Sequence, residues 1–294
     1  MNKLTNIYLS CIGDFLSEHD RYQWCQVSYF FRNVIMMNGI THVNYNRYIP
    51  IDLPYSVTYM NIQCSYIPFI KLPHGLEVLH LGDHFNQLIT LPPKLKVLRM
   101  GVSFNHPIVL PSTLVELHMS DRYTHYINIP TDLQIFYLSE FYNEPIDLPT
   151  KLLILRMGIK FNQPIVLPPT LRTLRLGFCY NQHIDLPSTL QNLYLGALFN
   201  QHIDLPFNLK NFRMGRMFNQ PIKLPLNLKT FRMGRMFNQP IKLPPNLKIL
   251  YIGRIFNQPI NLPKNLKILY IGKSFNQPIN LPISHPNLNI IPCM

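Results

Sequence analysis

The 294-residue sequence is poor in cysteine and tryptophan, and it lacks several common signatures. Its five cysteines are scattered and form no C-x-x-C pair, which argues for free thiols rather than a disulfide framework or a zinc site. There is no run of about eighteen apolar residues, so we expect no membrane span. The first residues do not form the apolar stretch of a secretory signal, so we expect a reducing, intracellular location.

Catalytic signatures are also missing. The sequence has no glycine-rich phosphate loop, no H-E-x-x-H segment and no recognisable pairing of a nucleophile with a histidine. His183 and His202 take the place of a repeated proline, and His80 and His118 fall in a repeated column. We therefore expect no enzyme activity, no catalytic residue, no metal and no cofactor.

Proline is absent from the first 49 residues, whereas all 27 prolines follow them. Since a proline costs about 3 kcal/mol inside a helix, this count excludes a mainly helical fold for the rest of the chain. The 47% of hydrophobic residues excludes wholesale disorder.

A Leu-Pro or Ile-Pro dipeptide recurs every nineteen residues, in thirteen units from Leu53-Pro54 to Leu281-Pro282. An isoleucine stands two residues before each dipeptide. The clearest unit covers residues 218–236 and reads F-N-Q-P-I-K-L-P-L-N-L-K-T-F-R-M-G-R-M. This constant register predicts an array of structural repeats.

Nineteen residues are too few for a helix pair, but they match the short end of leucine-rich repeats. The segment Leu247-x-x-Leu250-x-Ile252 has the strand pattern of such repeats, with Leu250 inward and Tyr251 outward. Gly253 then turns the chain off the strand, and the prolines favour an extended return. The sequence thus predicts a mainly β, leucine-rich-repeat-like solenoid of about 13 nineteen-residue coils with an extended convex side.

Two further columns follow from the period, because neighbouring coils bury a shared apolar face. The aromatic column contains Phe85, Phe104, Tyr123, Tyr142, Phe161, Tyr180, Phe199, Phe218, Phe237, Phe256 and Phe275. The asparagine column contains Asn86, Asn105, Asn143, Asn162, Asn181, Asn200, Asn219, Asn238, Asn257 and Asn276. We expect the asparagines to be buried and to satisfy backbone groups of adjacent coils.

Residues 1–45 differ from the repeats. Their apolar residues recur at a spacing of three to four, which predicts short helices that cap the first coil. We therefore divide the chain into a helical segment 1–45, a repeat solenoid 46–283 and a C-terminal tail 284–294.

The N-terminal pattern, with an apolar first helix, Asp20 at a break and the run Val27-Ser28-x-x-Phe31-Arg32, resembles an F-box. The repeats are similar to FNIP repeats, named for the F-N-x-P motif that stands here at residues 218–221. Together they resemble F-box and FNIP repeat proteins of amoebae and their giant viruses.

This resemblance implies a substrate-recognition subunit of a ubiquitin ligase, acting in the host cytoplasm. The F-box would dock on the Skp-type adaptor of a cullin–RING ligase, and the repeats would hold a target protein. The implied adaptor-binding residues are Leu4, Ile7, Ile12, Leu16, Trp24, Val27 and Phe31. The alternative is that these residues only pack the cap and that the chain is a plain binding scaffold.

The net charge of +13 is unevenly distributed. Residues 1–204 hold 14 basic and 14 acidic side chains, whereas residues 205–294 hold 13 basic and no acidic ones. The cations fall in columns that suit carboxylates or phosphates. The predicted partner-binding residues are Arg156, Arg175, Tyr194, Arg213, Arg232, Tyr251 and Tyr270 on the strands, with Arg216, Arg235, Arg254 and Lys273 after the turn glycine. Three alternatives remain: an acidic protein, a nucleic acid, or charge copied with duplicated repeats and without a partner.

Overall fold

The computed structural model describes residues 42–45, 56–67, 71–279 and 288–292. The chain divides into two compact units, unit 1 (Met1–Pro130) and unit 2 (Thr131–Met294). The expected helices of residues 1–36 lie outside the described residues. In the described part, no helix is long and apolar enough to cross a membrane.

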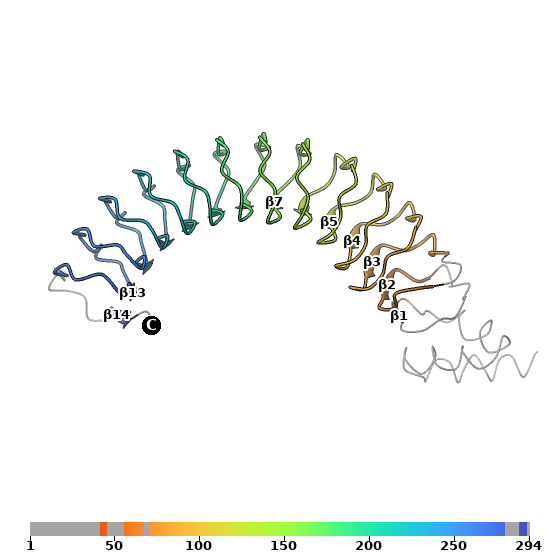
Figure 1. Cartoon of the computed structure of the whole chain (residues 1–294), viewed down its shortest axis with the longest axis horizontal. Coiled ribbons are helices and arrows are strands. Elements are labelled where there is room, and N and C mark those ends of the chain that lie inside the picture. Colours follow the sequence, from red (N-terminus) through yellow and green to blue (C-terminus); the bar gives the residue numbers. More distant parts are fainter. Residues whose placement is uncertain (1–41, 46–55, 68–70, 280–287, 293–294) are drawn as a thin grey trace, which may run out of the picture. The chain divides into compact units, whose positions relative to one another are not determined.

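The described residues of unit 1 form five parallel strands in chain order, which stack side by side along one edge of the coils (Figure 1). They are β1 (His42–Tyr45), β2 (Tyr59–Ile62), β3 (Val78–Leu81), β4 (Val97–Arg99) and β5 (Glu116–His118). The sheet thus begins inside the segment 1–45 that we separated from the repeats.

In unit 2, the residues that the structure describes form nine parallel strands, again in chain order. They are β6 (Ile135–Tyr137), β7 (Ile154–Arg156), β8 (Thr173–Arg175), β9 (Asn192–Tyr194), β10 (Asn211–Arg213), β11 (Thr230–Arg232), β12 (Ile249–Tyr251), β13 (Ile268–Ile271) and β14 (Asn289–Pro292). The last strand lies in the segment 284–294 that we treated as a tail.

The predicted mainly β solenoid is confirmed, with one nineteen-residue coil for each strand from β2 to β13. The ends deviate: His42 pairs with Tyr59 and Ile268 with Asn289, so the first step is shorter than nineteen residues and the last step longer. The return segments contain no helix among the described residues, in agreement with the extended side that the prolines predicted.

In ten coils of the described part of the chain, the repeated proline begins a tight turn that leads into the next strand. The backbone N–H of Leu228 donates to the carbonyl of Pro225 at 3.2 Å, and Leu209 does the same to Pro206 at 3.1 Å. The leucine then lies in the core and is fully buried. The proline is therefore placed where its fixed φ helps the turn and its missing N–H costs nothing.

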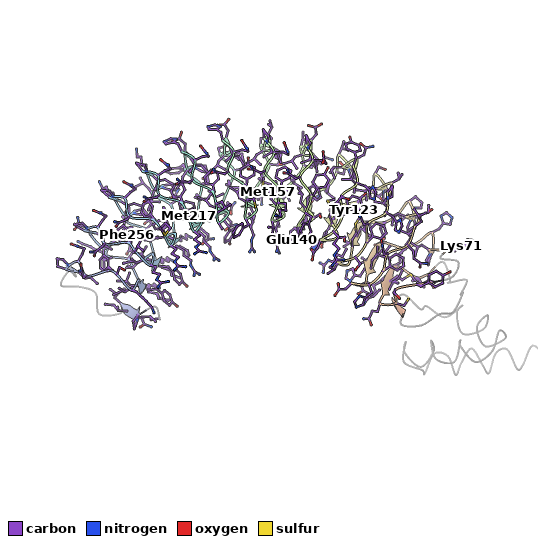
Figure 2. The ribbon with its side chains drawn as sticks, viewed as in Figure 1. Lys71, Tyr123, Glu140, Met157, Met217 and Phe256 are labelled. Carbon is purple, nitrogen blue, oxygen red and sulfur yellow. The ribbon has the colours of Figure 1, made fainter. Side chains whose placement is uncertain are left out.

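The aromatic column is confirmed as the centre of the core. Its rings are buried, except for the half-buried Phe275, and the rings from Phe85 to Tyr123 and from Phe161 to Phe275 stack on their neighbours with centroids 6.0–6.4 Å apart. Figure 2 shows these side chains inside the coils, with Tyr123 and Phe256 labelled. Tyrosine fits less well than phenylalanine, because the hydroxyl of Tyr180 is buried without a hydrogen-bond partner and burial raises its pKa to about 12.

The asparagine column links neighbouring coils as predicted. The amide oxygen of Asn200 accepts the backbone N–H of Asn219 at 2.8 Å, and Asn219 accepts that of Asn238 at 2.9 Å. The expectation that these side chains are buried was wrong, because they are half-buried or exposed. They directly follow the buried aromatic residues in the chain but lie closer to the surface of the coil.

Glycines after the strands let neighbouring backbones approach closely. A Cβ placed on Gly215 would overlap with the carbonyl oxygen of Gly196, and a Cβ on Gly196 would overlap with that of Gly177. The glycine is therefore needed for the close approach of two coils and not only for the turn that the sequence suggested.

We predict that Gly215→Ala lowers the free energy of unfolding by about 1–3 kcal/mol, because the added methyl group forces two coils apart. Urea unfolding followed by circular dichroism measures this loss. Met217→Ala, at a 42% exposed position two residues away, is the matched control and should change stability by no more than about 0.5 kcal/mol. Equal unfolding midpoints for the two variants would contradict the close-approach argument.

Candidate binding surface

The predicted adaptor-binding residues, Leu4 to Phe31, lie outside the described residues. The eleven predicted partner-binding residues all lie in unit 2, and we call them together the Arg–Tyr surface. Nine of them are exposed, whereas Tyr251 and Tyr270 are half-buried.

The strand residues of the Arg–Tyr surface form one column. Parallel pairing sets Arg156 beside Arg175, and Arg213 lies between Tyr194 and Arg232. The same register continues through the tyrosines of β12 and β13. The period of nineteen therefore predicted both the members of the column and their order.

The arginines and tyrosines of this column contact one another. The guanidinium of Arg232 lies 5.3 Å from the ring centroid of Tyr251, which stacks on Tyr270 at 4.1 Å with an interplanar angle of 4°. Such cation–π and stacking contacts hold the flat groups side by side. The arginine planes are thereby fixed in part before any ligand binds.

Two open cavities follow the Arg–Tyr surface. One of about 470 Å³ is lined by Arg213, Arg232 and Tyr251 together with the cations after the turn glycine. The other, of about 500 Å³, is lined by Arg156, Arg175 and Tyr194, and both cavities share Arg213, Met214 and Arg216. The shared residues make the two cavities neighbouring parts of one groove.

Positive charge in this groove is largely uncompensated. Partial burial, and then the charges of Arg232 and Arg175, lower the pKa of Arg213, although an arginine remains protonated at neutral pH. At the other end, the carboxylate of Glu140 lies 3.7 Å from Arg156. The groove is therefore best suited to an anion at its C-terminal half.

Several polar residues on or beside the Arg–Tyr surface were not predicted from the sequence. Tyr137 precedes Arg156 in the column, and the Arg156 guanidinium lies 5.9 Å from its ring centroid. Next to the column, Asn211 donates to Asn192 at 2.6 Å and Asn192 donates to Thr173 at 3.0 Å. Counting nineteen residues back from Arg156 would have found Tyr137, whereas the amide ladder follows from no single motif.

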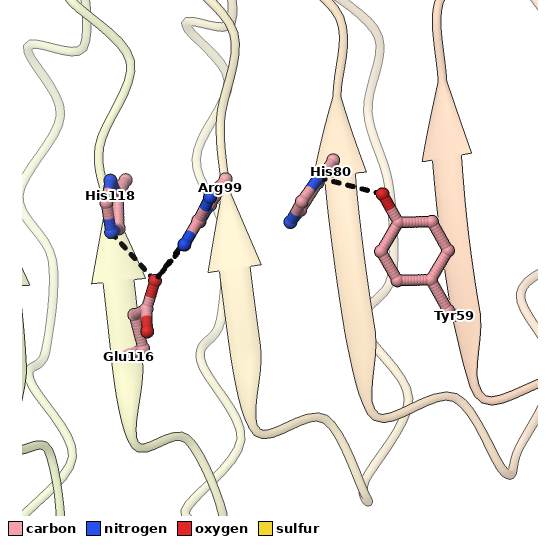
Figure 3. A network of polar contacts seen from close by, with 5 residues as sticks. All are labelled: Tyr59, His80, Arg99, Glu116 and His118. Carbon is pink, nitrogen blue, oxygen red and sulfur yellow. Dashed lines mark hydrogen bonds and ion pairs between the residues drawn. The ribbon is translucent and has the colours of Figure 1, made fainter. Parts of the chain in front are cut away.

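Unit 1 carries a different polar network on its strands (Figure 3). Arg99 donates to one oxygen of Glu116 from Nη2 at 2.8 Å and from Nε at 3.1 Å, and Nε2 of His118 lies 2.9 Å from the same oxygen. On the neighbouring strands the Tyr59 hydroxyl lies 3.2 Å from Nδ1 of His80. In unit 1 the cation at this strand position, Arg99, therefore pairs with a carboxylate of the protein itself, that of Glu116.

The charges and the partial burial of this network shift the pKa values of Glu116, His80 and His118. Burial opposes the charge of Glu116, but the hydrogen bonds and charges of Arg99 and His118 outweigh it and lower the pKa of Glu116. Burial, followed by the charge of Arg99, lowers the pKa values of His80 and His118. At neutral pH the network therefore holds one carboxylate, one guanidinium and neutral imidazoles.

The described residues contain no group of three or more His, Cys, Asp or Glu side chains that could hold a metal ion. The structure describes two cysteines, Cys64 and Cys179, and both are free thiols. Burial raises the pKa of Cys64.

We predict that Glu116→Gln lowers the stability of the protein by about 1 kcal/mol at neutral pH, because the charged hydrogen bonds are partly exposed on the Arg99 side. Since the folded state lowers the pKa of Glu116, this stabilisation is present above the unfolded pKa and disappears as the pH falls through the folded pKa. Urea unfolding at neutral and at acid pH measures both. Asp83→Asn, which removes an exposed carboxyl of the same unit, is the matched control, and a constant loss at every pH for Glu116→Gln would count against the ion pair.

The sequence and the structure were compared with known proteins. The FNIP repeat model matches residues 67–101, 85–122, 218–255, 237–261 and 256–291. A search of curated proteins found no significant match.

Two solved structures share the architecture. CroV588, described as a novel circular LRR protein, has 29% sequence identity and a TM-score of 0.70 over 87% of this chain. YopM from Yersinia enterocolitica WA-314 has 24% identity and a TM-score of 0.62 over 82% of this chain, and this likeness shows the fold alone. The chain spans about half the length of both proteins, 46% of CroV588 and 56% of YopM. The protein is thus a leucine-rich-repeat-like solenoid that contains FNIP repeats.

Proposed function

We propose that the protein is an interaction scaffold whose Arg–Tyr surface holds an acidic protein partner. The observation that carries this proposal is the column of arginines and tyrosines stacked in register above an open groove. Repeat solenoids of this kind use such extended surfaces for protein interaction. The proposed role is binding and involves no catalysis and no cofactor.

The chemistry of the groove favours a protein over a bare polyanion. Arginine and tyrosine are the residues that most often carry binding energy in protein interfaces. Exposed apolar side chains follow the strands beside the cations, among them Phe178 at 48%, Leu198 at 41% and Met217 at 42% exposure. A partner with carboxylates next to apolar residues would meet both kinds of group.

Charge repulsion supports a ligand at this site. Arg213 and Arg232 lie directly beside each other in a parallel pair, and like charges in that position are unfavourable. An anionic partner would replace this repulsion with pairs of opposite charge, and arginine can bind a carboxylate through two parallel hydrogen bonds.

The test uses peptides rich in glutamate and leucine, selected from a displayed library on the wild-type protein. We predict that Arg213→Ala combined with Arg232→Ala weakens the best peptide by at least about tenfold, measured by fluorescence anisotropy, because about 1.4 kcal/mol corresponds to a tenfold change in affinity.

The control for this experiment is Lys223→Ala combined with Lys242→Ala, which removes the same charge from exposed positions on the return segments. It should retain binding within about twofold, since distant charges are screened by salt. The proposal fails if no acidic peptide is selected, or if both double variants lose affinity equally.

We propose further that the N-terminal segment docks a Skp-type adaptor of a cullin–RING ligase, which would make the target on the Arg–Tyr surface a ubiquitination substrate inside a host cell. This part rests on the resemblance of residues 4–36 to an F-box. The alternative is a scaffold without a ligase role, in which the same apolar residues only pack the end of the solenoid.

We predict that Trp24→Ala combined with Leu16→Ala abolishes pull-down of the purified adaptor while leaving the urea unfolding of the repeats unchanged. Asn6→Ala combined with Ser10→Ala, at positions outside the F-box pattern, should bind like wild type. A wild-type chain that captures no adaptor would remove the ligase role and leave the binding scaffold.

A further inference from the structure

A second positively charged groove lies in unit 2, away from the Arg–Tyr surface. It has a volume of about 410 Å³ and precedes the strands β10 to β13. Its lining consists of Asn208, Lys210, Asn227, Lys229, Asn246, Lys248, Asn265 and Lys267. None of these residues lines the Arg–Tyr cavities, so we treat this lysine groove as a separate surface.

Backbone hydrogen bonds fix the lysines in a ladder. The N–H of Lys229 donates to the carbonyl of Lys210, that of Lys248 to Lys229 and that of Lys267 to Lys248, each at 2.8 Å. Adjacent lysines therefore leave the backbone about one strand spacing apart, roughly 4.8 Å. The four side chains are exposed, so their ammonium groups can reach a ligand that lies along the groove.

In an earlier part of the same column a cation is paired with an acidic residue. Lys96 pairs with Glu77 at 2.9 Å in unit 1, and in the adjacent column Lys151 pairs with Asp132 at 2.6 Å in unit 2. Each pair joins residues nineteen apart, so one coil supplies the cation and its neighbour the anion. Lys229, Lys248 and Lys267 have no such pairing among the described residues, and the chain holds no acidic residue after Asp204.

The asparagines hold their side chains in a fixed position beside the lysines. Nδ2 of Asn208 donates to the carbonyl of Ser188 at 2.9 Å, and Nδ2 of Asn246 and of Asn265 each donates to a carbonyl of the preceding coil at 3.1 Å. An amide nitrogen carries two donors, so one N–H of each side chain is left to donate to an acceptor in the groove. Each coil thus offers one ammonium group and one amide donor.

The lining determines which anion fits. The groove contains no aromatic and no apolar side chain, so it lacks the anchors on which protein interfaces depend. It also lacks a ring on which an unpaired base could stack, which single-strand binders use. Lysine and asparagine side chains are common contacts to phosphate oxygens, and a duplex backbone repeats one charge at regular steps.

We infer that the lysine groove binds the phosphate backbone of double-stranded nucleic acid without sequence preference. The inference does not depend on the proposed acidic partner, because the two surfaces share no residue. Each coil would contribute one lysine contact, so the four lysines would neutralise about four phosphates.

The experiment measures binding of the full chain to fluorescein-labelled duplex DNA of about 20 base pairs by fluorescence anisotropy over a range of NaCl concentrations. With four phosphates neutralised, the logarithm of the association constant should fall against the logarithm of salt with a slope near −3.6. Two duplexes of unrelated sequence should bind equally.

The test variant replaces Lys210, Lys229, Lys248 and Lys267 by Gln. We predict at least a tenfold loss of DNA affinity and a salt slope close to zero, since each lost phosphate contact removes about one unit of slope. The matched control replaces Lys94, Lys160, Lys223 and Lys242 by Gln, which removes the same charge at exposed positions outside the groove. It should keep most of the affinity and the slope, and urea unfolding shows whether both variants are folded.

Three results would overturn the inference. The first is a wild-type chain that does not bind the duplex even at low salt. The second is an equal loss in test and control variants, which would show an effect of net charge alone. The third is DNA binding that survives the lysine changes but is lost in Arg213→Ala combined with Arg232→Ala, which would place the nucleic acid on the Arg–Tyr surface. Loss of acidic-peptide binding in the arginine variant alone would leave the inference on the lysine groove intact.

Discussion

Neighbouring coils in each unit meet backbone to backbone, and the rest of the structure depends on this contact. It requires glycine at positions such as Gly215, where any Cβ would overlap with the carbonyl of the coil before it. It also fixes the register at nineteen residues, because each strand pairs with the equivalent residues of the next. Equivalent side chains of neighbouring coils therefore lie next to each other. The aromatic rings stack at centroid distances of 6.0–6.4 Å, and the asparagines form a hydrogen-bonded row.

This register explains how much of the molecule could be predicted. Residues that repeat, such as Phe218, Asn219 and Arg232, had their columns and order fixed by the period alone. The contacts of residues that break the pattern could not be predicted in this way. Glu116 stands in a column where the preceding coil carries Val97, so its bond to Arg99 depends on side-chain conformations that one sequence does not specify. The solvent exposure of the asparagines was also not predicted. The repeat period determines which residues align between coils, but it does not determine how far each side chain is buried.

The same stacking controls electrostatics. When a coil that contains a lysine or an arginine is duplicated, the new cation lies next to the equivalent cation of the original coil. Lys229 lies next to Lys210 in this way. In the earlier coils acidic residues are also present, and some form pairs such as Lys96 with Glu77, whose opposite charges largely cancel at a distance. In the last coils the columns hold one sign only. Ten of the 13 cations after Asp204 thus lie on two separate surfaces of unit 2, with different lining chemistry and hence different expected ligands.

Between Gly82 and Gly272 the glycine column is interrupted twice, in the coils on either side of the division between the units. Ser120 and Ser139 occupy the glycine position in consecutive coils, and both are fully buried. The Ser120 hydroxyl donates to the carbonyl of Val102 at 2.7 Å, and the division of the chain at Pro130 falls between the two serines. A glycine at this position leaves room for the backbone of the preceding coil, and the side chain of a serine takes up that room. Within unit 1, the hydroxymethyl group of Ser120 is therefore expected to hold its coil further from the preceding one than a glycine would, while its hydroxyl forms a hydrogen bond to that coil.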